Sequence, residues 1–322
     1  MICFGREDFI MREFVFDHRT APTPSCHAST LVVLKDGTIL TAWFGGTREG
    51  SRDVKIWSSR RENGVWSRPV CVSDEPGVHW NPVLFELNGG IGLFYKLSEG
   101  QIDNWHTRFR FSTDGGRSWT PSRDLVPGEI GGRGPVKNKP LRLSDGSILA
   151  PASHEDLPDP PAWKAFADRS EDEGASWNAS AYFESDADLI QPSFWEPEPG
   201  KVHALLRSNK GYAYRVDSED FGRTWSPAYP TKMPNNNSGL DLTYAKGSLW
   251  LVCNPISGNW ASRSRLVLFR STDNGEHFER YLRLEGDPSK EYSYPAVVYA
   301  DGALHITYTW RRERVAYIRV EI

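Results

Sequence analysis

Six segments of the chain share one pattern, in which alternating apolar residues lead into a tight turn with glycine and then into a second alternating run. They occupy residues 29–44, 81–96, 139–153, 191–208, 239–254 and 294–310. Alternation with a period of two is typical of half-buried β-strands, and a glycine turn between two such runs marks a β-hairpin. The pattern therefore predicts six hairpins, with turns at Gly37, Gly89, Gly146, Gly200, Gly247 and Gly302.

A second repeated motif, of the form Ser-x-Asp-x-Gly-x-Ser/Thr-Trp, lies between the hairpins. Four copies begin at Ser112, Ser170, Ser218 and Ser271, and a degenerate copy without the Asp begins at Ser58. In such a turn the Asp binds nearby backbone amides, the Gly adopts a positive φ, and the aromatic residue packs the turn onto its sheet. We therefore interpret these aspartates as structural.

The two motifs together predict the architecture. The turn glycines recur about every 50 residues, which is enough chain for two hairpins in each repeat. Six four-stranded antiparallel units arranged around an axis form an all-β, six-bladed β-propeller, which protects its sheet edges by repetition. We expect one domain over residues 1–322, closed by pairing of an N-terminal strand around residues 14–18 with C-terminal strands near residues 317–322.

Composition and charge narrow the function. Within 322 residues of formal net charge −4, no apolar run approaches the roughly 20 residues of a membrane helix. Acidic and basic residues are mixed, which argues against nucleic acid as a partner. Charged residues near the start interrupt any apolar signal core, so we expect a cytoplasmic location, or a periplasmic or secreted one if a leader was removed. The four cysteines lack metal-site spacing, and we expect free thiols and no metal or cofactor.

The Ser-x-Asp-x-Gly turns resemble the Asp-box (BNR) repeats of the sialidase, or neuraminidase, superfamily, and the resemblance covers essentially the whole chain. It implies a propeller in which three arginines hold a sugar carboxylate. It also implies a tyrosine nucleophile activated by a glutamate, and an aspartate as acid/base. Asp-boxes also occur in non-catalytic propellers and in some polysaccharide lyases, so the function has to be argued from the site.

Three positions match the family's site. Tyr292, in the Tyr-Ser pair that opens the last hairpin, takes the place of the nucleophile. Arg207, which closes the fourth hairpin, and Arg263, eight residues before Ser271, match the second and third arginines. Paired guanidinium groups bind a carboxylate in a bidentate manner, which a lysine cannot do.

Other positions depart from the family pattern. His27 stands where the first arginine is expected, and Gln191 stands where the glutamate that activates the tyrosine is expected. A neutral amide cannot take a tyrosine proton. Glu49 and Asp53, in the segment FGGTREGSRD, are the candidates for the acid/base.

The ends of the inner strands line the mouth of a propeller, so the polar residues that flank the hairpins are candidates for binding substrate. Beyond the matched arginines, these candidates are Arg48, Trp80, Asn81, Lys96, Lys139, Asp241, Tyr294 and Arg311. Charged and amide groups from all six repeats indicate an anionic, hydroxyl-rich ligand such as an acidic glycan.

Three functions remain open from the sequence. The first is a sialidase-like exo-glycosidase that acts on sialic acid or a related acidic sugar. The second is a lyase that cleaves a uronic-acid glycan by β-elimination, in which Gln191 and the arginines neutralise the carboxylate and Tyr292 or His27 moves the proton. The third is a non-catalytic propeller that binds glycans. The sequence leaves the sugar, its linkage and the oligomeric state open.

Overall fold

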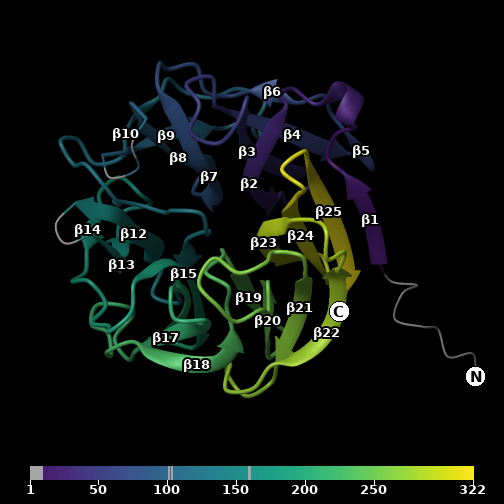
Figure 1. Ribbon diagram of the computed structural model, residues 1–322. Helices are drawn as coiled ribbons and strands as arrows, with labels where there is room; N and C mark the ends of the chain where they lie inside the picture. The colour runs from purple at the N-terminus through teal and green to yellow at the C-terminus, as the bar shows by residue number, and fades with distance from the viewer. Residues whose placement is uncertain (1–9, 101, 103, 159–160) are drawn as a thin grey trace, which may run out of the picture.

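The computed structural model describes residues 10–100, 102, 104–158 and 161–322. Within these residues the protein is an all-β, six-bladed β-propeller, whose sheets are arranged as a ring around a central axis (Figure 1). The chain passes through the blades in order, from the purple β1 to the yellow β25. The predicted fold is therefore confirmed.

The strands pair antiparallel within each blade, and the innermost strand of blades 1 to 5 comes first in the sequence. Blade 1 contains β2 (Ser25–Val33), β3 (Ile39–Gly46), β4 (Lys55–Glu62), β5 (Val65–Trp66) and β6 (Val70–Cys71), the last two both pairing with β4. Blade 2 contains β7 (Val78–Leu87), β8 (Gly90–Ser98), β9 (His106–Ser112) and β10 (Arg123–Asp124). Blade 3 contains β11 (Leu141–Arg142), β12 (Ile148–Pro158), β13 (Pro161–Ser170) and β14 (Asn178–Ala179).

The remaining blades follow the same plan. Blade 4 contains β15 (Leu189–Glu198), β16 (Lys201–Ser208), β17 (Tyr212–Ser218) and β18 (Tyr229–Pro234). Blade 5 contains β19 (Asp241–Ala245), β20 (Ser248–Cys253), β21 (Leu266–Ser271) and β22 (Glu279–Glu285). Blade 6 contains β23 (Tyr292–Ala300), β24 (Ala303–Trp310), β25 (Arg314–Glu321) and the N-terminal β1 (Ile10–Phe14). A short 3₁₀ helix, η2 (His18–Thr20), follows β1.

Blade 6 closes the ring by pairing the two ends of the chain. β1 pairs antiparallel with β25, in a register that places Ile10 opposite Val320 and Phe14 opposite Ala316. The predicted closure is confirmed, but the strand lies before the expected residues 14–18. Asp17 ends the extended segment because its side chain caps η2 by accepting a hydrogen bond from the amide of Arg19.

The Asp-box turns have the predicted structural role. In the second blade, Asp114 Oδ1 accepts hydrogen bonds from the amides of Arg117 (3.0 Å) and Ser118 (2.9 Å) and from the hydroxyl of Ser112 (2.8 Å). The pattern of bonds recurs around Asp172, Asp220 and Asp273. A hydrogen bond from the Ser118 hydroxyl, together with these bonds, holds the pKa of the Asp114 carboxyl well below its usual range, so the carboxylate is committed to its own turn.

Further expectations concern the turn glycines, the tryptophans of the Asp-boxes, the thiols and a membrane-spanning helix. The turn glycines of all six hairpins have positive φ, for example 80° at Gly37 and 81° at Gly200. Trp177 and Trp225 pack in the core and donate hydrogen bonds to carbonyls of their own Asp-box turns. Cys26, Cys71 and Cys253 are free thiols, and Cys3 lies outside the described residues. No helix in the described part of the chain is long and apolar enough to span a membrane.

In every blade the backbone is irregular either within the inner strand or just before it. One non-glycine residue with positive φ precedes each turn glycine by eight to ten positions, as Gln191 precedes Gly200; the six are Ala28, Asn81, Lys137, Gln191, Asn237 and Tyr294. In β2, β7, β15 and β23 the strand register also shifts there, as in a β-bulge. Bulges and positive-φ residues redirect side chains and cost free energy, so six such residues, four of them in bulges, at one level of the ring indicate a functional site.

Candidate functional site

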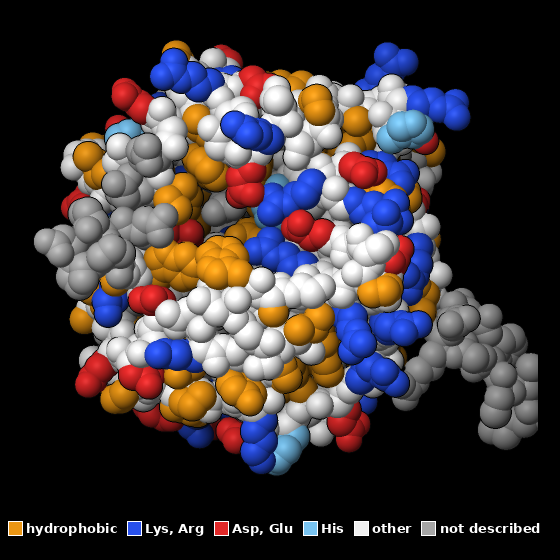
Figure 2. Space-filling view, in the orientation of Figure 1, with side chains coloured by type: hydrophobic (Ala, Val, Ile, Leu, Met, Phe, Trp, Pro, Cys, Tyr) orange, Lys and Arg blue, Asp and Glu red, His pale blue; other side chains and the backbone are white. Residues whose placement is uncertain are grey.

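Two of the irregular positions, Asn81 and Tyr294, line a polar pocket at the mouth of the central channel. The pocket has a volume of about 310 Å³ and is lined by His27, Glu49, Trp80, Asn81, Ile102, Trp105, Glu155, Trp163, Arg207, Trp260, Arg263, Tyr294 and Arg312. All six blades or the loops beside them contribute to it. Figure 2 shows charged side chains of both signs beside a hydrophobic patch around the hollow centre of one face.

Arg207, on β16, is the most deeply buried of the pocket arginines. It is 2% exposed and donates from Nε to Asn237 Oδ1 (2.6 Å) and from Nη1 to the phenolic oxygen of Tyr294 (2.9 Å). Its guanidinium also lies 5.2 Å from the ring centroids of both Trp163 and Trp260. These contacts fix the plane of the guanidinium, and a fixed plane favours bidentate binding of a carboxylate.

Arg263 and Arg312 are held together by one carboxylate. Glu291 Oε1 accepts hydrogen bonds from Arg312 Nε (2.9 Å) and from Arg263 Nη1 (3.4 Å). Burial would raise the pKa of Glu291, but the two guanidinium groups hold it below its usual value. Arg312 also donates from Nη1 to Glu49 Oε2 (2.6 Å). The pocket therefore contains three guanidinium groups, from blades 4, 5 and 6.

Tyr294 lies among these cations. Its ring is 5.6 Å from the Arg263 guanidinium and 5.9 Å from the Lys137 ammonium. Gln191 Nε2 is 3.5 Å from the phenolic oxygen, so both Gln191 and Arg207 donate toward that oxygen. Donors that face an oxygen stabilise negative charge on it.

His27 packs against Tyr294, with ring centroids 4.1 Å apart, and its Nδ1 lies 3.0 Å from Thr309 Oγ1. Burial lowers the pKa of His27 well below its usual value, and Arg312, Arg263, Arg207 and Lys137 lower it further. The imidazole is therefore neutral at physiological pH. A neutral imidazole beside a phenol can accept or return a proton.

Four tryptophans form an aromatic part of the pocket lining. Trp80 and Trp105 meet edge to face at 6.4 Å in blade 2, and Trp163 and Trp260 do so at 5.7 Å between blades 3 and 5. Trp260 is 61% exposed, which is unusual for so large a side chain. Flat indole faces beside charged groups suit a sugar ring, which has apolar C–H faces and polar edges.

Seven residues predicted from the sequence meet in this pocket, namely His27, Glu49, Trp80, Asn81, Arg207, Arg263 and Tyr294. Gln191 lies directly behind them, in contact with Arg207 and Tyr294. The resemblance to the sialidase superfamily predicts His27, Glu49, Arg207 and Arg263, and a position beside a hairpin predicts Trp80, Asn81 and Tyr294.

The structure places Tyr292 and Arg311 outside the pocket, unlike their neighbours Tyr294 and Arg312. Tyr292 is 2% exposed and belongs to the apolar core shared by blades 5 and 6. The guanidinium of Arg311 lies 3.9 Å from the ring centroid of Trp310. In each case the bulge or turn determines which residue points toward the axis, and sequence spacing does not resolve this.

The other predicted residues have structural partners away from the pocket. The carboxylate of Asp53 accepts bonds from the amide and hydroxyl of Thr47, and Arg48 is exposed on the same loop. Lys96 is fully buried and donates to Thr107 and to the carbonyl of Arg133.

Lys139 and Asp241 form an ion pair at 2.9 Å. Asp241 also accepts bonds from the hydroxyl of Ser193 and the amide of Val297, so it links its own blade 5 to blades 3, 4 and 6. These contacts give Lys139 and Asp241 a structural role that requires no bound ligand.

Sequence reasoning did not select Arg312, Ile102, Trp105, Glu155, Trp163 and Trp260 as site residues. Arg312 carried a detectable signal. It lies in the three-residue turn between β24 and β25, where Arg311 and Arg312 both have positive φ. Such turns normally contain Asn or Gly, so two arginines there indicate a functional constraint. Glu155 lies on β12, close after the third predicted hairpin, whereas Ile102, Trp105, Trp163 and Trp260, on loops or on β13, carried no spacing signal.

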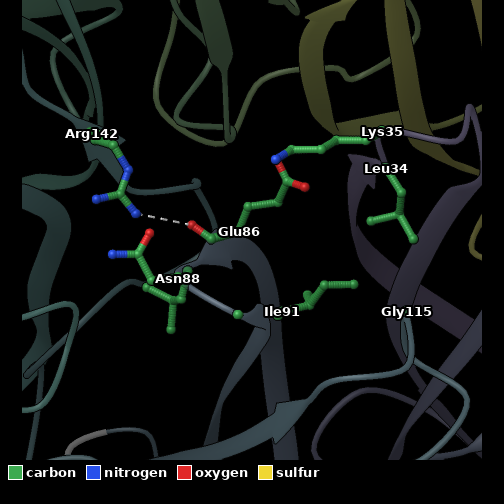
Figure 3. A pocket seen from close by; sticks show the side chains of 10 residues that line it. Leu34, Lys35, Glu86, Asn88, Ile91, Gly115 and Arg142 are labelled. Carbon is green, nitrogen blue, oxygen red and sulfur yellow. Dashed lines mark hydrogen bonds between the residues drawn. The ribbon is translucent and has the colours of Figure 1, made fainter.

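A larger cavity, of about 480 Å³, lies elsewhere (Figure 3). It is formed by the turns after β2 and β7, and Arg142 donates there to the carbonyl of Glu86 (3.4 Å). Leu34, which lines it, follows the end of β2, whereas His27 lies near the start of that strand. A strand rises about 3.3 Å per residue, so this cavity opens at the other end of the ring. No group of His, Cys, Asp and Glu among the described residues could hold a metal ion.

Comparison with solved structures identifies the same fold in sialidases. The Hadza microbial sialidase Hz136 superposes with a TM-score of 0.81 at 15% identity, over 97% of this chain and 68% of that chain. A Dyadobacter fermentans protein described as of unknown function superposes with a TM-score of 0.78 at 17% identity, over 98% of this chain and 99% of that chain. Trypanosoma rangeli sialidase in complex with the inhibitor DANA superposes with a TM-score of 0.75 at 14% identity, over 96% of this chain and 59% of that chain.

These identities establish the shared propeller alone, and the chain spans about two thirds or less of the two sialidases. No curated protein matches the sequence. The profile of the BNR repeat-like domain family, however, matches residues 37–306, which include the Asp-box turns and most of the inner strands. This protein therefore belongs to the BNR repeat-like domain family and has a sialidase-like six-bladed β-propeller.

Proposed function

We propose that this protein is an exo-acting glycoside hydrolase that removes a carboxylate-bearing sugar, sialic acid or a related acidic sugar, from a glycan. The observation that carries the proposal is the convergence of Arg207, Arg263 and Arg312 on one pocket of about 310 Å³. That volume suits one sugar ring with its substituents. Three guanidinium groups in a confined, partly desolvated pocket favour an anionic ligand.

The side chains of the pocket have distinct roles in this proposal. The arginines hold the carboxylate, and Glu49 donates a proton to the leaving oxygen as the glycosidic bond breaks. Tyr294 approaches the anomeric carbon, where Arg207 and Gln191 stabilise negative charge on its phenolic oxygen. His27 accepts the phenol proton as the bond between the Tyr294 oxygen and the anomeric carbon forms. Water then attacks that carbon and gives its proton to the Glu49 carboxylate, while the bond to Tyr294 breaks and the phenol takes its proton back from His27.

The proposal is tested with fluorogenic glycosides of sialic acid, of glucuronic acid and, as the neutral control, of glucose. We expect release of the fluorophore only from acidic sugars. The proposal is wrong if the glucoside is cleaved at a comparable rate, or if no acidic sugar is bound or turned over.

Gln191 and His27 favour a second candidate, a lyase acting on a uronic-acid glycan. Gln191 replaces the expected carboxylate beside Tyr294, and the neutral His27 packs against the same ring. In β-elimination the arginines would acidify the proton next to the carboxylate, Tyr294 or His27 would remove it, and the C4–O bond would break to leave a C4=C5 double bond. An unsaturated product absorbs in the ultraviolet, whereas a hydrolysis product does not, so one absorbance assay on a uronide glycan separates the two reactions.

A further inference from the structure

Arg312 is held by two carboxylates on different sides. Glu291 Oε1 accepts from Nε at 2.9 Å, and Glu49 Oε2 accepts from Nη1 at 2.6 Å. Both neighbours raise the pKa of the guanidinium against the opposing effect of burial, so Arg312 is permanently charged. A ligand carboxylate that enters the pocket therefore meets a guanidinium that already has anionic partners.

The two carboxylates differ in how firmly they are held. Glu291 directly precedes β23, and its Oε1 also accepts from the hydroxyl of Ser293 (2.9 Å) and from Arg263. Glu49 lines the pocket from the loop between β3 and β4, with a side chain 40% exposed. Glu291 thus supports two arginines from behind, whereas Glu49 occupies the side of Arg312 that faces the ligand.

The loop that carries Glu49 is held by bonds that do not involve Glu49. The Asp53 carboxylate accepts from the amide and hydroxyl of Thr47, and the amide of Val54 donates to the carbonyl of Ser51. Gly50, with a φ of +82°, faces the indole of Trp80. The Glu49 side chain can therefore change rotamer while the loop keeps its backbone conformation.

We propose that Glu49 occupies the carboxylate position in the free protein, and that an acidic sugar displaces it from Arg312 on binding. The inference rests on the proposed function, because it requires that the pocket takes a carboxylate. In the free protein Glu49 is ion-paired with Arg312. Once the ligand's carboxylate replaces it, Glu49 is released from the guanidinium and its side chain can turn toward the leaving group. The approach of Glu49 to the leaving group is thus coupled to the presence of a carboxylate on the substrate.

Titration calorimetry with free N-acetylneuraminate and free glucuronate tests this inference on the full chain. The variant is Glu49→Gln, which keeps the size of the side chain and removes its charge. The matched control is Glu198→Gln, which removes an exposed carboxylate from blade 4, where it pairs with Lys201. Equal melting temperatures of the three proteins establish that all are folded.

We expect Glu49→Gln to bind the acidic sugar more tightly than the wild type, by roughly two- to fivefold, because an exposed ion pair has a small free energy. Glu198→Gln should bind like the wild type. Weaker or equal binding by Glu49→Gln, with clear binding by the wild type, would overturn the inference and leave the proposed function intact. If neither protein binds either sugar, the proposed function fails as well.

Discussion

Single residues determine which of two neighbours enters the pocket. Tyr292 and Tyr294 lie two positions apart, and in a regular strand they would point to the same side. The bulge between Ser293 and Ala296, with a φ of 52° at Tyr294, turns the second tyrosine toward the axis and leaves the first in the core. The same kind of backbone constraint separates Arg312 from Arg311.

This arrangement predicts opposite results for two conservative substitutions. Tyr294→Phe should lower kcat on an acidic sugar glycoside by about a hundredfold or more, because it removes the oxygen that faces Arg207 and Gln191. Tyr292→Phe should leave kcat within about twofold, because that side chain lies in the core and outside the pocket.

Steady-state kinetics on both variants checks the prediction, with melting temperatures as the control for folding. A large loss of kcat in Tyr292→Phe, with Tyr294→Phe still active, would assign the role to the other tyrosine.

The residues found from the sequence and those missed differ in a physical way. His27, Arg207 and Arg263 are predicted by the resemblance to the sialidase superfamily, whose site residues lie at fixed distances from the hairpins and Asp-boxes. Trp163 and Trp260 enter from β13 and from the loop between β20 and β21, whose path depends on contacts between blades. Contacts of that kind have no period along the chain.

Among the elements, the hairpins and Asp-box turns follow from alternation and turn chemistry, whereas the bulges of the inner strands do not. An apolar alternation continues on both sides of a bulge, so the extra residue is not evident in the pattern. The predicted mouth positions nevertheless included Asn81, Gln191 and Tyr294, because polar residues interrupt the apolar runs there.

The Asp-box turns should contribute to stability and not to binding. Asp114→Ala removes the acceptor for the amides of Arg117 and Ser118 and for the hydroxyl of Ser112. We expect the free energy of unfolding to fall by about 1 kcal/mol, as when a helix loses its capping residue. The KM for substrate should not change.

Urea unfolding measures this effect, with Asp74→Ala as a matched control. Asp74 has a side chain 87% exposed and pairs with Arg110 only at 3.6 Å, so its replacement should change stability by less than about 0.5 kcal/mol. An altered KM in Asp114→Ala would contradict a purely structural role.

At the scale of the whole molecule, one pairing closes the ring. β1 adds five residue pairs to β25, and Glu13 also accepts hydrogen bonds from Arg61 and from the indole of Trp66. The N-terminal strand therefore connects blade 6 to blade 1. Without it, β25 would become an exposed sheet edge.

Deletion of residues 1–14 should accordingly lower the free energy of unfolding by about 3 kcal/mol, given a net contribution of roughly 1 kcal/mol per hydrogen bond. Glu13→Gln, which retains the strand, should lower it much less. Urea unfolding of both variants tests the prediction, and an unchanged midpoint after the deletion would show that the ring is closed by other contacts.

The stability of the whole propeller should also depend on pH through a buried lysine. Burial lowers the pKa of Lys96 to about 7, although Asp168 and Glu155 oppose the shift. Its Nζ donates to two acceptors, Thr107 Oγ1 and the carbonyl of Arg133, which a neutral amine can also satisfy. Between this pKa and the ordinary lysine value of about 10.4, the unfolded chain binds more protons at Lys96 than the folded protein does. The free energy of unfolding therefore rises with pH in that window, by up to about 1.4 kcal/mol per pH unit.

Urea midpoints of the wild type and of Lys96→Met, measured at pH 7 and pH 9, isolate this contribution. The wild type should gain stability relative to the variant as the pH rises, and parallel pH profiles of the two proteins would contradict the assignment.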